Sequence, residues 1–364
     1  MKIFFYQAEC GDAARIRYQG EDGKYHNMFI DSGFDRTFRY ILANELERIK
    51  AEGEVIDGWV ISHIHDDHIG GVVRYLDSIV SGEFEDIVQA WYYNPPRHYT
   101  PKQEVSGKIS EIMSIDQGDL LYNYLQDKCK LPESDFVSGV TLPKTGGLEA
   151  TVLSPSAAKL GKLRKKYSDQ KTPLQQNEDE SVSEAVAAKS FDYHIEMEKF
   201  DLAKWSQDTS IENGSSISLL TCYRGINILW LADSHPSDIV KSLSDLGYTN
   251  QNKIKCQWVK VAHHGSKGNN SNALYSLIDC ENYLISANGE NNHCLPTKES
   301  IVRIIRNTHR PKGSRYKFYF TYDNSTLREI FKNEDSGIFE KWNFEMFYLS
   351  EGKYYDFDMP DTGF

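Results

Sequence analysis

The stretch WVISHIHDDHIGGVVRYL, Trp59 to Leu76, places three histidines and an aspartate at positions 63, 65, 67 and 68. An apolar, β-branched run, VIDGWVIS, leads directly into these residues and predicts a strand. After them, apolar residues recur at the spacing of one helix face, at 69, 72, 73, 76 and 80. The histidines and the aspartate therefore occupy a strand-to-helix turn.

Imidazole and carboxylate groups crowded into such a turn are typical ligands of zinc, manganese or iron. In an extended run His63 and His65 point the same way, whereas Asp67 and His68 lie where the chain turns into the helix. The pattern thus aims two pairs of ligands at two neighbouring positions. The alternative is a histidine-rich surface loop or a satisfied core histidine, and it explains neither the aspartate nor the strand-turn-helix context.

Composition places the chain among globular proteins. It has 364 residues, of which 40% are hydrophobic and 12% aromatic, and its formal net charge is −12. Six scattered cysteines form no C-x-x-C pair, so we expect reduced thiols. The N-terminus has too short an apolar segment for a signal peptide, and no apolar run is long enough to span a bilayer. We expect a cytoplasmic protein without membrane contacts.

Strand-like and helix-like segments alternate along most of the chain. The Asp22-Gly23 and Arg224-Gly225 pairs predict hairpins between successive strands. This order favours an α/β sandwich with sheets inside and helices outside. We interpret residues 1–364 as a single domain, with a polar insertion at about 157–209, where a basic block precedes an acidic one, and a C-terminal extension at about 325–364.

Several motifs occur in an order that resembles the metallo-β-lactamase fold superfamily. They are CGDAARI, FIDSG, SHIHDDHIGG with its H-x-H-x-D-H signature, LSP, NGSSISLL, ILWLAD, VKVAHHGS and LISANGENNHCLP. Within the superfamily the chain is most similar to the hydrolase domain of the ComEC/Rec2 competence proteins and their free-standing relatives. The resemblance implies a four-layer αββα sandwich that binds two divalent metal ions, zinc or manganese. His63 and His65 would bind one metal, and Asp67 and His68 the other.

The resemblance also implies ligands that lie far along the chain. One histidine of the His263-His264 pair would join the second metal, and His264 is preferred. Asp233, at the end of an apolar strand, would bridge the two metals; its alternative role is the N-cap of the following helix. Asp31 would accept the N–H of a ligand histidine and so fix its orientation, although a plain turn after a strand explains it equally well.

One ligand of the superfamily pattern has no clear counterpart here. Many members carry a further histidine between the H-x-H-x-D-H motif and the bridging aspartate, and only His98 and His194 fall in that interval. His98 follows an expected strand and is the better candidate. His293 matches a histidine before proline in the competence-type proteins and could donate to a substrate phosphate or act on the leaving group, although an ordinary loop histidine explains it equally well. The candidate catalytic residues are therefore Asp67, Asp233 and His293.

The activity that this resemblance implies is metal-dependent phosphodiester hydrolysis through a metal-bridged hydroxide, most specifically by a nuclease acting on DNA or RNA. Seven Lys or Arg residues against one acid between Lys298 and Lys317 suggest a surface for nucleic acid, although they could equally be the solvated face of a helix. The first alternative is hydrolysis of a small phosphodiester or ester, such as a cyclic nucleotide or a phosphorylcholine ester. The second is a metal-stabilised regulatory subunit that needs a partner.

Overall fold

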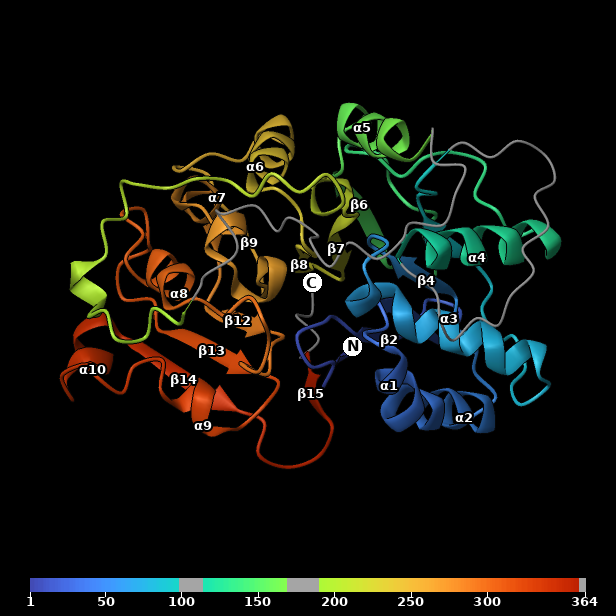
Figure 1. The fold of residues 1–364 in the computed structure, drawn as a ribbon, viewed down its shortest axis with the longest axis horizontal. Coiled ribbons are helices and arrows are strands. Elements are labelled where there is room, and N and C mark those ends of the chain that lie inside the picture. The colour runs from blue at the N-terminus through green and yellow to red at the C-terminus, as the bar shows by residue number, and fades with distance from the viewer. Residues whose placement is uncertain (98–113, 169–189, 360–364) are drawn as a thin grey trace.

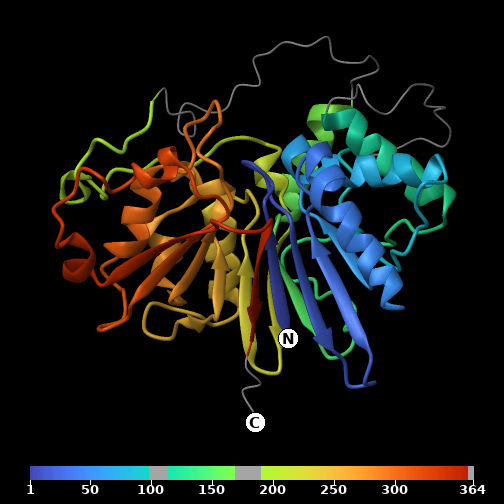
Figure 2. The ribbon, with the colours of Figure 1, turned by 90° about the horizontal axis from the view of Figure 1, so that it is seen from below.

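The computed structural model describes residues 1–97, 114–168 and 190–359. Two sheets face each other in the middle of the molecule, and helices cover the outer side of each (Figure 1 and Figure 2). The expected four-layer αββα sandwich is confirmed. Among the described residues, no helix is both long and apolar enough to cross a lipid bilayer.

The first sheet has six strands in the order β15-β1-β2-β3-β4-β5. They are β1 (Lys2–Tyr6), β2 (Ala14–Gln19), β3 (Tyr25–Ile30), β4 (Gly58–Ile61), β5 (Trp91–Tyr93) and β15 (Tyr354–Asp358). The hairpin expected around Asp22-Gly23 is present, because β2 and β3 pair antiparallel. β3, β4 and β5 run parallel, so the loops that follow β3 and β4 leave the sheet at the same edge.

The second sheet has seven strands in the order β14-β13-β12-β10-β8-β7-β6. They are β6 (Glu149–Ser154), β7 (Ser218–Tyr223), β8 (Ile226–Trp230), β10 (Trp258–Lys260), β12 (Asn282–Ile285), β13 (Tyr316–Phe320) and β14 (Phe344–Tyr348). Arg224 and Gly225 both have positive φ, as the tight turn between β7 and β8 requires. The short strands β9 (Ile254–Lys255) and β11 (Ile278–Asp279) form a separate pair.

Alternation of side chains along each strand builds the layers. On β1, Ile3 and Phe5 pack between the two sheets, whereas Phe4 and Tyr6 pack against the helices of the first sheet. A strand covered on both faces must be apolar at every position, which explains the uninterrupted run IFFY. A third apolar cluster lies between the second sheet and its own helices.

Helices form the two outer layers. Those packed beside the first sheet are α1 (Asp35–Thr37), the π-helical turn η1 (Phe38–Leu42), α2 (Ala43–Ala51), α3 (Asp66–Val80), α4 (Ser114–Asp127) and α5 (Ala157–Ser168). Those on the second half are α6 (Pro236–Asp245), α7 (Asn272–Ser276), α8 (Lys298–Ile305), α9 (Ser325–Arg328) and α10 (Ile338–Trp342). Short 3-10 turns, η3 (Met197–Lys199), η4 (Asn213–Ser215), η5 (Ala262–Gly265) and η6 (Lys267–Asn269), complete the described structure.

The described parts of the two regions that we interpreted as additions pack into the fold. Within 157–209, Leu160 and Leu163 of α5 pack into the cluster beside the first sheet, and Met197 is fully buried beside the second. Within 325–364, β14 pairs with β13 of the second sheet, and β15 pairs with β1 of the first. Single-domain organisation over 1–364 stays a prediction, but the described residues of these segments belong to the packed fold.

Candidate metal centre

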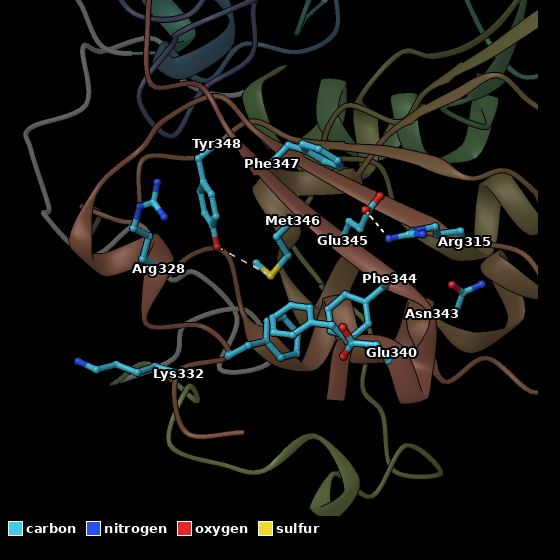
Figure 3. A pocket seen from close by; sticks show the side chains of 12 residues that line it. Arg315, Arg328, Lys332, Glu340, Asn343, Phe344, Glu345, Met346, Phe347 and Tyr348 are labelled. Carbon is cyan, nitrogen blue, oxygen red and sulfur yellow. Dashed lines mark hydrogen bonds and ion pairs between the residues drawn. The ribbon is translucent and has the colours of Figure 1, made fainter. Parts of the chain in front are cut away.

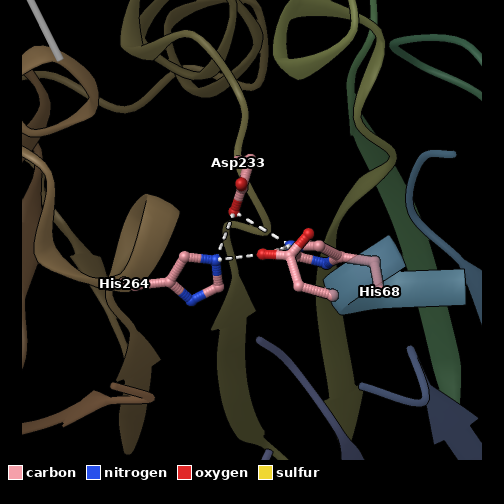
Figure 4. A group of neighbouring side chains, drawn as sticks. His68, Asp233 and His264 are labelled. Carbon is pink, nitrogen blue, oxygen red and sulfur yellow. Dashed lines mark ion pairs between the residues drawn. The ribbon is translucent and has the colours of Figure 1, made fainter. Parts of the chain in front are cut away.

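Loops that follow strands of both sheets bring the sequence-predicted ligands together. His63 and His65 follow β4, and Asp67 and His68 begin α3. Asp233 follows β8, and the two neighbouring histidines at 263 and 264 follow β10. Figure 4 shows Asp233 reaching between His68 and His264, which come from the two halves of the sandwich.

Four of these side chains surround one point. Asp67, His68, Asp233 and His264 each offer a ligand atom, and all four atoms lie within 4.8 Å of one another. The Oδ2 atom of Asp67 is 3.6 Å from Nε2 of His68 and 3.1 Å from Nε2 of His264. Oδ1 of Asp233 is 3.4 Å and 3.6 Å from the same two nitrogens. Bonds of zinc length in a tetrahedron separate ligand atoms by ~3.3–3.6 Å, so this donor set fits a transition-metal ion.

The ligand atoms at this point are otherwise left without partners. Nε2 of His68, Oδ1 of Asp233 and Nε2 of His264 are buried, and none has a hydrogen-bond partner among the described residues. Buried polar atoms in native proteins are nearly always satisfied. Three such atoms converging on one point are explained by a cation that they would bind.

A second donor group lies on the other side of Asp233. Nε2 of His63 is 3.0 Å from Nδ1 of His65 and 3.9 Å from Oδ2 of Asp233. Nε2 of His263 lies 3.5 Å from the same Oδ2 atom. Each carboxylate oxygen of Asp233 thus faces a different donor group, which is the geometry of a carboxylate that bridges two metals.

His263 occupies the place for which the sequence offered no clear histidine. His98 lies outside the described residues, and the exposed His194 does not line the metal pocket. The His263-His264 pair therefore divides between the two donor groups, and the preferred His264 joins Asp67 and His68. The roles of both histidines as metal ligands stay predictions. The geometry further indicates that His263 would complete the first site.

Hydrogen bonds orient the ligand nitrogens of His68 and His264. Nδ1 of His68 donates to Oδ2 of Asp31 over 2.8 Å, and the same carboxylate accepts from the backbone and the hydroxyl of Ser62. Nδ1 of His264 donates to the carbonyl oxygen of Ser286 over 3.0 Å. Since a carbonyl can only accept, the proton is on Nδ1 and the lone pair of Nε2 faces the candidate metal position. Asp31 thus makes the contact that the resemblance implied.

Asn269 orients His263 in the same way, although no motif in the sequence indicated this residue. Its Oδ1 atom is 2.8 Å from Nδ1 of His263. Its amide nitrogen faces acceptors, namely Oδ2 of Asp208 at 3.1 Å and the carbonyl of Asp233 at 3.0 Å. The amide oxygen must therefore face the imidazole and accept its Nδ1 proton, which leaves Nε2 free to bind a metal.

The backbone is strained where these side chains are presented. Asp31, Ala232, His263 and His264 all have φ between 44° and 56°. This left-handed region is unfavourable for residues with a Cβ atom and clusters at functional sites. Two consecutive left-handed histidines allow neighbouring side chains to reach different donor groups.

The buried acidic groups of the candidate metal centre need positive charge beside them. Burial lowers the pKa of His68 and His264, but the carboxylate of Asp233 and its acidic neighbours outweigh burial and raise both pKa values well above the usual range. Burial raises the pKa of Asp233, but the surrounding histidines outweigh that effect and hold it well below its usual range. Asp233 therefore stays ionised, and protons or metal ions must supply the compensating charge.

A buried ion pair that the sequence did not indicate supports the group around His264. Asp12, from the CGDAARI segment, pairs with Lys260 of β10, and its other oxygen lies 3.3 Å from Nδ1 of His264. Gly11 permits the approach of this loop, because a Cβ atom there would lie 2.2 Å from the carbonyl oxygen of Asp67. The CGDAARI motif thus contributes a carboxylate that contacts a ligand histidine.

A pocket of about 450 Å³ opens above the donor groups. Asp67, Asp233 and His293 all line it, so the three candidate catalytic residues share one cavity. Lys166 of α5 also lines it and pairs with Glu212, which accepts a hydrogen bond from Tyr167 as well. Burial raises the pKa of Glu212, but His65, Lys166 and Tyr167 outweigh it and lower the pKa.

A larger cavity of about 710 Å³ lies beside the edge strand β14 (Figure 3). Phe344, Met346 and Tyr348 line it, with Arg315 and Arg328 at its border. Arg315 pairs with Glu345, and Arg328 pairs with Asp323. None of its lining residues belongs to the candidate metal-ligand groups, so the smaller pocket is the candidate active site.

Five of the seven basic residues between Lys298 and Lys317 are buried or half-buried, whereas Lys312 and Arg315 are exposed. The Lys298 and Arg303 side chains are 0% exposed and pair with Glu334 and Glu299. Arg306 and Arg310 donate to backbone carbonyls of neighbouring segments. Neither the nucleic-acid interpretation nor the solvated-face interpretation fits these four residues, because long-range packing uses their charges inside the fold. A nucleic-acid partner stays a prediction, and these four residues do not offer their charges to it.

A comparison with protein-family models agrees with the resemblance to the metallo-β-lactamase superfamily. Residues 22–135 match the family model described as the metallo-beta-lactamase superfamily. The match covers the segment that carries the H-x-H-x-D-H motif, and the αββα fold and the His/Asp donor groups agree with it. The closer similarity to ComEC/Rec2 proteins stays a prediction. A comparison with curated protein sequences gives no match.

Among solved structures, the chain is similar to "CmlA, a diiron beta-hydroxylase from Streptomyces venezuelae". Identity is 10% and the TM-score is 0.42, with 98% of this chain and 54% of that chain covered. This chain therefore spans about half the length of that protein. A likeness at this level carries no argument about activity.

Proposed function

We propose that the chain is a metal-dependent phosphodiester hydrolase, and most specifically a nuclease. The observation that carries the proposal is the placement of Asp233, whose two carboxylate oxygens face two separate donor groups. His63, His65 and His263 would hold one cation with Asp233, and Asp67, His68 and His264 the other. Two bound cations supply a water of lowered pKa and neutralise the charge that protects a phosphodiester from attack.

The remaining pocket residues suit a phosphate group. His293 and Lys166 line the cavity and can donate hydrogen bonds to non-bridging phosphate oxygens or to the departing oxygen. In the reaction, water adds to phosphorus, one P–O ester bond breaks, and the leaving oxygen takes a proton. The products are a phosphomonoester and an alcohol.

A small phosphodiester or ester is the second candidate substrate. It is favoured by the volume of about 450 Å³ and by the depth of Asp233 and His264, whose side chains are only 1% and 2% exposed. A metal-stabilised regulatory role is less well supported, because Asp67, Asp233 and His264 line a pocket of about 450 Å³ that could admit a substrate.

One assay panel tests the proposal. Purified protein is incubated with labelled single- and double-stranded DNA, RNA and a bis-aryl phosphodiester, with Mn²⁺, Zn²⁺ or a chelator. We expect metal-dependent cleavage of at least one phosphodiester and none with chelator. Absence of cleavage under every metal condition would contradict the proposal, and cleavage of only the small diester would favour the second candidate.

A further inference from the structure

Helix α5 has one apolar and one basic face. Leu160, Leu163 and Tyr167 are buried in the cluster beside the first sheet. Lys162, Lys165 and Lys166 are exposed, with spacings of three and four residues that place them on one side of the helix. The sequence of α5, AAKLGKLRKKYS, contains no acidic residue. In a chain of net charge −12, this face is a local exception.

The other basic residues of α5 anchor the helix. Lys159 pairs with Asp238, and Arg164 pairs with Asp135. These pairs, together with the buried apolar face, hold α5 in place and leave the lysine face turned outward. The face is thus part of a packed element rather than of a loose segment.

The lysine face is continuous with the candidate active site. Lys166 lines the metal pocket and pairs with Glu212, and Tyr167 donates to the same carboxylate. α5 also packs against η4, whose Asn213 lines the pocket. In Figure 2, α5 lies at the end of the sandwich from which the loops of both sheets emerge. A chain of phosphates crossing α5 would therefore arrive at the donor groups.

The depth of the metal pocket favours a single-stranded over a double-stranded nucleic acid. Asp233 and His264 line the pocket, and their side chains are only 1% and 2% exposed. A flexible single strand can lower one phosphate into such a pocket while basic side chains hold its neighbours. A duplex holds its phosphates on a stiff, convex surface and therefore fits such a pocket less well.

We propose that Lys162, Lys165 and Lys166 of α5 form a binding track for the phosphate backbone of a single-stranded nucleic acid that enters the metal pocket. This inference rests on the proposed phosphodiesterase function and names its substrate class. It places the contact with nucleic acid on α5, whereas four of the basic residues between Lys298 and Lys317 are used inside the fold.

The test measures strand binding separately from cleavage. A fluorescent, phosphorothioate-substituted single strand is titrated with metal-loaded protein, and anisotropy is recorded from about 50 to 300 mM KCl. The variant is Lys162→Gln/Lys165→Gln, and the matched control is Lys255→Gln/Lys312→Gln, which changes two exposed lysines outside the pocket. Circular dichroism checks that both variants are folded.

We expect Lys162→Gln/Lys165→Gln to weaken binding at least about fivefold at low salt. It should also reduce the slope of log affinity against log salt by up to about 1.4, since each single-strand phosphate contact contributes about 0.7. The control should behave like the wild type. Equal slopes for both double variants, no strand binding by the wild type, or binding to phosphatidylserine vesicles but not to the strand would each overturn the inference.

Failure of the proposed function gives a different result. If the wild type cleaves neither nucleic acid nor the bis-aryl phosphodiester, the hydrolase proposal fails, whatever the anisotropy shows. If it cleaves the small diester but does not bind the strand, the hydrolase proposal stands and the α5 track fails.

Discussion

At the scale of single residues, Asp233 is the group on which the candidate site depends. Asp233 does not cap the next helix, because α6 begins at Pro236 with His235 as its N-cap. Asp233 instead is 1% exposed and lies within 4 Å of histidines from both donor groups. Its charge is therefore placed to hold cations rather than to cap a helix.

Replacing Asp233 with Asn keeps the size of the side chain but removes the charge shared by two cations. We expect Asp233→Asn to fold, to bind less metal, and to lose phosphodiesterase activity by at least about a hundredfold. Metal analysis and turnover with excess metal measure this. Asp238→Asn, in the first turn of α6, is the control and should keep its metal. Wild-type turnover in Asp233→Asn would exclude the bridging role.

Asn269 sets which nitrogen of His263 is free. Asn269→Ala removes the acceptor of the Nδ1 proton, so the imidazole can rotate or change tautomer. We expect weaker binding at the first metal position, by roughly 10–100-fold, with the second position retained. Stepwise metal titration resolves the two sites. Asn252→Ala, at an exposed position, is the control, and two unchanged affinities in Asn269→Ala would show that Asn269 does not position His263.

At the scale of elements, α3 carries two ligands and approaches the loop after β3 closely. A Cβ atom at Gly71 would lie 2.3 Å from the carbonyl oxygen of Ser32. Gly71→Ala should therefore push α3 away from this loop, lower the free energy of unfolding by about 1–3 kcal/mol, and weaken metal binding. Urea unfolding and metal titration measure both effects.

Gly161 of α5 provides the matched control for Gly71. No atom lies within 4 Å of a Cβ built on Gly161, so Gly161→Ala should leave the stability unchanged or raise it by up to about 1 kcal/mol. If Gly71→Ala is as well tolerated as Gly161→Ala, the close packing of α3 on the loop after β3 is not needed for the site.

His26 links β3 to two neighbouring turns. Its Nδ1 atom is 2.8 Å from Asp57 and its Nε2 atom 3.1 Å from Asp22. Burial lowers the pKa of His26, but hydrogen bonds with the two carboxylates outweigh it and raise the pKa above 6.5. The protonated form is thus favoured by folding, so its contribution is complete below the unfolded pKa and is lost as the pH rises through the folded pKa.

His26→Gln removes this titration. We expect it to lower the free energy of unfolding by roughly 0.5–1 kcal/mol near pH 5.5 and by less near pH 9. Urea unfolding of the wild type and the variant at both pH values measures the difference. A cost that is the same at both pH values, or larger near pH 9, would contradict the assigned direction of the pKa shift.

At the scale of the whole molecule, the C-terminal segment supplies an edge strand of the first sheet. β15 pairs with β1 over five residues, from Lys2 with Asp358 to Tyr6 with Tyr354. Without β15, β1 would become an exposed edge strand with apolar side chains. The two chain ends therefore stabilise each other, although they are remote in sequence.

Truncation tests the contribution of β15 to the first sheet. A chain ending at residue 349 lacks β15, whereas a chain ending at residue 359 keeps it. We expect the shorter chain to have a free energy of unfolding lower by at least about 2 kcal/mol and to aggregate more readily. Urea unfolding and light scattering compare the two. Equal stability would mean that β15 adds little to the first sheet.

The sequence alone determined the features that depend on neighbouring residues. The strand-turn-helix around His63, the hairpins at Asp22-Gly23 and Arg224-Gly225, and the alternation of strands and helices follow from periodicity and turn chemistry. The spacing H-x-H-x-D-H by itself also indicates two ligand pairs, since a single turn fixes their relative positions.

Only the tertiary structure decided which distant side chains meet. Asp12 pairs with Lys260 across 248 positions, and His263 faces Asp233 because two left-handed residues follow β10. Lys298 and Arg303 looked like a charged surface in the sequence, yet packing buries them against acidic groups and backbone carbonyls. Local pattern does not specify these partners, because the free energy of burying a charge depends on groups that only the folded chain brings near.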